Sequence, residues 1–122
     1  MRAKGAIFSA VVTLLGALGF SSADVERVAV AGGIGSGINI GNAVRIGMFP
    51  DLPLEKYGYV GNSSLAGAYA MLVSEAAALR LKELSKSMTY LELSTQPGYM
   101  DAFTAACFLP HTDTALFPSV KQ

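Results

Sequence analysis

The sequence has very little of the chemistry from which metal and redox centres are built. Its 122 residues include one cysteine, Cys107, and one histidine, His111. A single cysteine excludes an internal disulfide, an iron–sulfur cluster and a cysteine-rich metal site made by this chain alone. With one histidine beside it, a structural zinc site is not expected either. We therefore predict no metal ligands in the chain.

An excess of charge of one sign is also missing. Nine lysines and arginines balance nine aspartates and glutamates, so the formal net charge is zero. Nucleic acids and anionic membranes attract proteins through an excess of positive charge, so neither is expected as a partner. Apolar residues make up 52% of the chain, which is enough for one domain with a real core.

The N-terminus lacks an apolar run of membrane-spanning length. The apolar stretch 6–18 is shorter than the roughly 20 residues that a span needs. It follows a basic opening and precedes small residues at 21–23, which is the layout of a secretory signal peptide. A buried helix over residues 2–18 of a larger fold explains the same pattern. The N-terminus by itself leaves both interpretations open.

Strands and helices are predicted to alternate along the rest of the chain. Short β-branched segments predict strands at 27–31, 57–61 and 88–94, the first of them buried. Helices are predicted over 39–47, 65–87 and 97–108, with Asn39 or Ser36 capping the first, Ser63 or Ser64 capping the second, and a break at Ser74. Single turns are expected after Ser22 and at 54–56, and residues 109–122 are expected to form a tail. This order indicates an α/β fold.

Five glycines between Gly32 and Gly41 follow the first predicted strand. A Walker-type phosphate loop needs a lysine where Ile38 stands, and a GxGxxG dinucleotide motif needs its third glycine at the same place. What remains is a strand, a Gly-Gly turn and a helix. Missing side chains would let a flat ring or a ribose lie against the main chain, and the helix start near Asn39 offers amides to an anion. A tight turn without a ligand is the alternative.

The chain resembles the C-terminal part of the ATP-dependent reductive activators of corrinoid proteins in three segments: RAKGAI, VAVAGGIGSGINIGNAVRIGMFPDLPLEKYGYVGNSSLAGA and YLELSTQPGYMDAFTAACFLPHTDTALFPS. Activators of this family carry an N-terminal iron–sulfur region and an actin-like ATPase domain, related to sugar kinases, heat-shock chaperones and actin. The motifs occur in the same order and cover the chain from Arg2 to about Val120.

The resemblance implies that residues 1–122 are a single domain, the C-terminal portion of an actin-like (ribonuclease H-like) ATPase lobe, with a short sheet and packed helices. RAKGAI matches an internal helix, which disfavours the signal peptide and makes the chain a fragment of a larger protein. The parent would be cytoplasmic, would use ATP with Mg²⁺, and would hold an iron–sulfur cluster outside this chain. Its partner would be a corrinoid protein, and a homodimer is left open.

The resemblance also assigns the glycine stretch. A strand ending in Gly-Gly before a helix is the adenosine motif of that superfamily, and the family often has an aromatic residue where Ile34 stands. The implied nucleotide-binding residues are Ala31, Gly32, Gly33, Ile34 and Gly35. Three further residues are expected either at the edge of the nucleotide cleft or as helix caps: Asn39, Asn62 and Ser64.

By resemblance, the parent would return a Co(II) corrinoid to Co(I) for methyl transfer, and no catalytic residue is predicted in this chain. The alternatives are a kinase-like phosphotransferase that shares the adenosine motif, and a standalone interaction module with a cleaved N-terminus. His111 and Asp113 are interpreted as hydrogen-bonding residues of the tail, and Cys107 as a buried, inert thiol.

Overall fold

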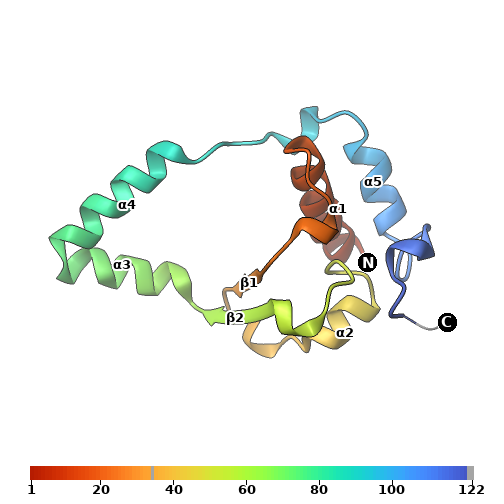
Figure 1. Cartoon of the computed structure of the whole chain (residues 1–122), viewed down its shortest axis with the longest axis horizontal. Coiled ribbons are helices and arrows are strands. Elements are labelled where there is room, and N and C mark those ends of the chain that lie inside the picture. The colour runs from red at the N-terminus through yellow and green to blue at the C-terminus, as the bar shows by residue number, and fades with distance from the viewer. Residues whose placement is uncertain (34, 121–122) are drawn as a thin grey trace.

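The computed structural model describes residues 1–33 and 35–120 (Figure 1). Its regular elements are α1 (Arg2–Ala17), β1 (Val28–Ala31), α2 (Ile40–Arg45), β2 (Tyr57–Gly61), α3 (Ser63–Val73), α4 (Glu75–Ser87) and α5 (Tyr99–Ala106). Single 3-10 turns lie at Ser22–Asp24, Gly35–Gly37, Leu54–Lys56, Leu93–Thr95 and Thr114–Leu116. The predicted α/β class and all the predicted helices are confirmed.

The sheet consists of β1 and β2, which pair in parallel with Val30 opposite Tyr59 and with an irregularity before Ala31 opposite Gly61. Parallel neighbours need a crossover connection, and α2 lies within it. The prediction that β1 is buried is wrong, because its residues alternate between half-buried and exposed. Parallel strands are buried only where both faces of the sheet are covered.

The predicted third strand is also wrong. Residues 88–92 have no regular structure, and Leu93–Thr95 is a 3-10 turn. The Glu92 carboxylate folds back on its own segment, where it accepts hydrogen bonds from the Ser94 N–H at 3.2 Å and the Ser94 hydroxyl at 2.7 Å. Met88 and Tyr90 are 80% and 82% exposed. Alternating polarity alone does not make a strand when local side-chain bonds hold the backbone in a turn and no neighbouring strand pairs with it.

The core lies where α1 packs against α5 and the C-terminal tail. Phe8 of α1, Ala106 of α5 and Phe117 of the tail are buried together. The His111 ring lies 5.3 Å from the Phe8 ring, centroid to centroid. The stretch predicted as a tail therefore supplies part of the core, because its aromatic side chains fill the space beside α1.

A buried lysine joins α1 to the end of α5. Lys4 is 3% exposed, and its ammonium group donates to the main-chain carbonyls of Ala106, Phe108 and Pro110, the last at 2.6 Å. The last carbonyls of a helix lack partners within the helix, and a cation there also interacts favourably with the helix dipole. Lys4 thus neutralises the C-terminal end of α5, and burial lowers the pKa of its ammonium group, partly offset by the nearby Cys107.

Short polar side chains begin the helices. Asn39, one of the two predicted candidates, caps α2 by accepting from the Asn42 N–H at 2.9 Å. The break predicted at Ser74 is confirmed, and Ser74 caps α4 by accepting from the Ala77 N–H at 3.2 Å. The cap of α3 is Asn62, one of the two interpretations offered for it, rather than Ser63 or Ser64. The turn at Ser22–Asp24 is capped by the residue before it, Ser21.

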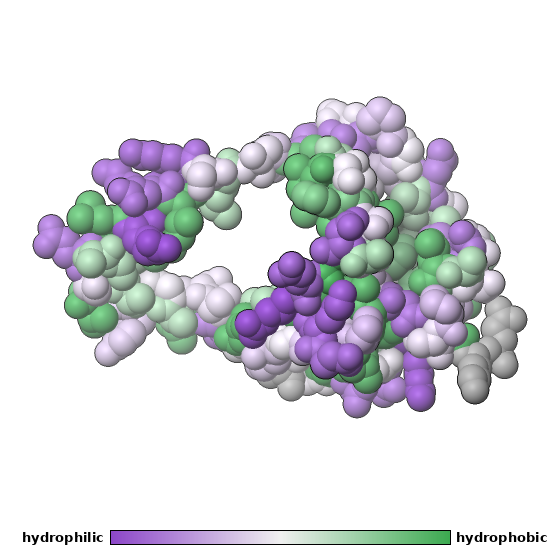
Figure 2. All heavy atoms as spheres, in the orientation of Figure 1, coloured by the Kyte–Doolittle hydropathy of each residue, from purple (hydrophilic) through white to green (hydrophobic). Residues whose placement is uncertain are grey.

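Helices α3 and α4 form an arm that extends away from the rest of the molecule, and the space-filling view shows an opening between the two parts (Figures 1 and 2). None of the residues of α3 and α4, all of which the structure describes, is buried. Exposed apolar side chains of the arm include Leu65, Tyr69, Leu72, Val73, Leu79 and Leu84. Of the helices that the structure describes, none is both long and apolar enough to cross a membrane.

Candidate functional site

The carboxyl ends of β1 and β2 meet at one edge of the sheet, and the glycine turn begins there. The Gly32 N–H donates to the Gly61 carbonyl at 2.9 Å. Gly32 has φ +92° and Gly61 has φ +71°, a conformation that glycine adopts without the steric cost of a side chain. In open α/β sheets, ligands bind outside the carboxyl ends of the strands, so this edge is the candidate site.

The space that a side chain would occupy at Gly32 and at Gly33 is empty of described atoms. A Cβ added at either glycine would meet no described atom within 4 Å, apart from its neighbours in the chain. The φ angle of Gly33 lies outside the left-handed region, so the backbone conformation there does not require glycine. The missing side chains therefore leave room for a flat group against the backbone, as the adenosine motif requires.

Gly35 is needed for a different reason. It is buried, and a Cβ there would lie 2.6 Å from Cε2 of Tyr59 and 3.0 Å from Cγ1 of Val30. The Tyr59 hydroxyl reaches further along the turn and donates to the Gly32 carbonyl at 2.9 Å. Sequence reasoning missed Tyr59 because it is one of five tyrosines, and only the pairing of Tyr59 with Val30 places it beside the turn.

The structure brings some of the predicted residues together and separates others. Ala31 ends β1 and pairs with Gly61, so Gly32, Gly33 and Asn62 lie at the same edge. The Asn62 side chain accepts from the Leu65 N–H at 3.1 Å. Ser64 is exposed in the first turn of α3. Ile34 lies outside the described residues.

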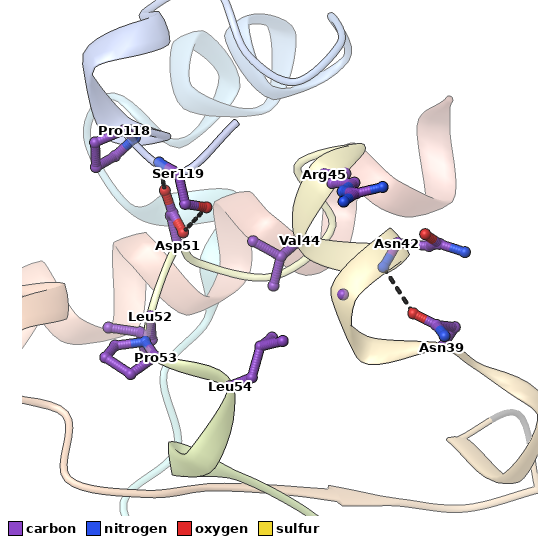
Figure 3. Close-up of a pocket in the computed structure, with 11 residues that line it drawn as sticks. Asn39, Asn42, Val44, Arg45, Asp51, Leu52, Pro53, Leu54, Pro118 and Ser119 are labelled. Carbon is purple, nitrogen blue, oxygen red and sulfur yellow. Dashed lines mark hydrogen bonds between the residues drawn. The ribbon is translucent and has the colours of Figure 1, made fainter. Parts of the chain in front are cut away.

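Asn39 faces a neighbouring cavity of about 670 Å³ between α2, residues 51–54 and residues 118–119 (Figure 3). Asn42 and Arg45 also line this cavity. The Asp51 carboxylate across it accepts from the Ser119 N–H at 2.7 Å and from the Ser119 hydroxyl at 2.6 Å. These bonds tie the C-terminal tail to the segment after α2.

The lone histidine and its neighbours are engaged in structural contacts. His111 Nδ1 accepts from the Asp113 N–H at 2.9 Å, and the Asp113 carboxylate accepts from the Ala115 N–H at 3.0 Å. Burial lowers the pKa of His111, and the charge of Lys4 lowers it further. The predicted hydrogen-bonding role of this pair is what the structure displays.

Cys107 follows α5 and is half-buried rather than buried. Its Sγ lies 3.0 Å from the position of a Cβ at Gly5 of α1, so glycine allows this close approach of the two helices. Among the described residues, no three His, Cys, Asp or Glu side chains are grouped so that they could hold a metal ion. The glycine turn itself offers main-chain surface, and Asn62 beside it caps a helix.

A parallel strand pair with a glycine turn at its carboxyl edge is what the resemblance to an actin-like domain predicts. A family described as the C-terminal domain of RACo, the ASKHA domain, matches residues 1–121. The chain belongs to this family, which confirms the resemblance inferred from the sequence.

Two relatives extend this comparison. The corrinoid activation enzyme RamQ of Eubacterium limosum is 29% identical over 101 residues, which are 83% of this chain and 17% of that protein. A solved structure of a reductive activator for corrinoid, iron–sulfur protein superposes with a TM-score of 0.92 and 49% identity, covering 98% of this chain and 19% of that one. The chain thus spans less than a fifth of the length of either relative.

Proposed function

We propose that this chain is the adenosine-side portion of an ATP-dependent reductive activator of a corrinoid protein. The observation that carries the proposal is the space beside Gly32 and Gly33, where an added Cβ would meet no described atom within 4 Å, at the carboxyl edge of the parallel strands. Membership of the activator family and the names of the two relatives support it.

The fit to ATP is limited to the adenosine end. Ala31, Gly32, Gly33, Ile34 and Gly35 would hold the base or the ribose against the main chain. Asn62 and Ser64, after the neighbouring strand, would form the edge of the cleft, with Asn39 beside the adjoining cavity. Residues that precede this chain in the parent would bind the triphosphate and Mg²⁺, so we expect no ATP hydrolysis by this chain alone.

The parent protein is a longer polypeptide in this proposal. Leu72 is 86% exposed and Leu65 is 67% exposed on the arm, and soluble proteins rarely leave large contiguous apolar patches exposed. We infer that other parts of the parent, or a second copy of it, cover this face. The length of the relatives agrees with that inference.

The residues present do not fit an iron–sulfur cluster, since such clusters are held by several cysteine thiolates and the chain has one. The cluster would lie elsewhere in the parent. The proposed reaction adds one electron to Co(II) of the partner's corrinoid, giving Co(I), and the low-potential cluster is oxidised by one electron. ATP would stabilise one arrangement of activator and partner through its contacts with the glycine turn, and hydrolysis would release that arrangement.

The test is ATP-dependent formation of Co(I), followed by its absorbance, with the full-length parent, a corrinoid protein and a low-potential reductant. Gly33→Val should lower ATP affinity at least about tenfold, because its side chain enters the space proposed for the nucleotide. Gly37→Val is the matched control, since a Cβ at Gly37 also meets no described atom within 4 Å.

Wild-type parent that forms Co(I) equally well without ATP would contradict the proposal. Equal losses in the two valine variants would assign the effect to the loop rather than to the site. Phosphoryl transfer to a small acceptor, without dependence on a corrinoid, would favour the kinase-like alternative.

A further inference from the structure

We propose that Tyr59 is a positioning residue that sets the glycine turn for the nucleotide before it binds. Nothing in the sequence pattern marks Tyr59, and it lies on β2 rather than in the glycine motif. The inference rests on the proposed function, because it concerns the same adenosine site. It is carried by two contacts of one side chain, a hydrogen bond at the start of the turn and ring packing at its end.

The first contact orients Gly32. The Tyr59 hydroxyl donates to the Gly32 carbonyl at 2.9 Å, and the Gly61 carbonyl accepts from the Gly32 N–H at 2.9 Å. Both main-chain polar groups of Gly32 are therefore bonded to β2. A glycine at φ +92° has many accessible conformations in the unfolded chain, so two bonds to a neighbouring strand are an effective way to fix one of them.

The second contact supports Gly35. A Cβ at Gly35 would overlap the Tyr59 ring at 2.6 Å, so the ring lies directly over this glycine. Tyr59 thus touches the turn on both sides of Gly33, where an added Cβ would meet no described atom within 4 Å. A turn held at both ends loses little conformational entropy when a ligand binds, which is the energetic benefit of preorganisation.

Tyr59 is not a core residue, since it remains 45% exposed. Tyr57, two residues earlier on the same strand, has a purely structural environment. Its hydroxyl donates to the Pro50 carbonyl at 2.6 Å, its ring stacks on Phe49 with centroids 5.8 Å apart, and burial, with a contribution from Asp51, raises its pKa to about 12. Tyr57→Phe is therefore a matched control, because it removes the same kind of bond away from the turn.

The experiment compares wild type, Tyr59→Phe and Tyr57→Phe in the full-length parent. Equilibrium binding of ATP, the KM and kcat for ATP, and the thermal midpoint are measured for each. Tyr59→Phe keeps the ring and loses one hydrogen bond, so the Kd and KM for ATP should rise about three- to tenfold with kcat unchanged. Tyr57→Phe should lower the thermal midpoint and leave both constants unchanged.

Equal Kd values for ATP in Tyr59→Phe and wild type would overturn the inference while leaving the proposed function intact. A rise in Kd of the same size in Tyr57→Phe would also overturn it, because general loosening of β2 would then explain the effect. Wild-type parent that does not bind ATP would overturn the proposed function itself, and the inference with it.

Discussion

Replacing the buried Lys4 by methionine should destabilise the domain far more than the same substitution at an exposed lysine of a helix. Methionine has a similar length and an unbranched side chain, but it cannot donate to the carbonyls at the end of α5. Two of the three bonds, to Ala106 and Pro110, are buried. The third, to Phe108, is partly exposed to water.

The magnitude follows from those two buried bonds. A buried acceptor left without a partner costs about 1–3 kcal/mol, while the ammonium group of the wild type carries a desolvation penalty that methionine avoids. We therefore expect the free energy of unfolding to fall by about 2–5 kcal/mol in total, a large fraction of the roughly 5–15 kcal/mol typical of a domain.

Urea denaturation, followed by circular dichroism, measures this loss. Lys86→Met is the control, because Lys86 is exposed near the end of α4 and should change stability by less than about 0.5 kcal/mol. The reasoning would be refuted if the two methionine variants had the same stability. It would then follow that water or a shifted backbone satisfies the carbonyls without Lys4.

Two further predictions concern the tail and the glycine turn. Burial, together with the charge of Lys4, lowers the pKa of His111 below 6.5, so the unfolded chain binds more protons just below that pH. The free energy of unfolding should therefore fall as the pH is lowered from about 7 to 5. His111→Asn should make this dependence on pH weaker, as measured by urea titrations at several pH values. The same pH dependence in the variant and the wild type would contradict this. Gly35→Ala should lower the free energy of unfolding by about 1–3 kcal/mol, because the added methyl group overlaps the Tyr59 ring. Adding Tyr59→Leu should recover part of this loss in the same assay. A double variant with no recovery would assign the loss to the backbone instead.

Elements with strong local signals were predictable from the sequence. Asn39 and Ser74 begin helices because their side chains satisfy the first free amides, wherever the helix lies in the fold. The glycine pair after β1 marks a turn for an equally local reason, since Gly32 adopts a positive φ. The resemblance to corrinoid activators added the identity of the fold, which periodicity alone could not supply.

Features that depend on distant partners were not predictable. Residues 88–94 alternate like a strand, but no strand in the part of the chain that the structure describes pairs with them, and Glu92 bonds locally instead. The partial exposure of β1 depends on which elements cover the sheet rather than on the sequence of the strand itself. The tail around Phe117 becomes core because α1 and α5 leave apolar surface beside it.

The sequence by itself determined the helices, the first two strands, the start of α2 at Asn39 and the glycine turn, because each depends on residues a few positions apart. It also excluded an iron–sulfur site, since one cysteine cannot hold a cluster. Only the tertiary structure decided that Lys4 closes the end of α5 and that Tyr59 braces the turn between Gly32 and Gly35. The hydrogen bonds among those contacts join residues 27 to 106 positions apart, and only the folded chain brings such residues within hydrogen-bonding distance.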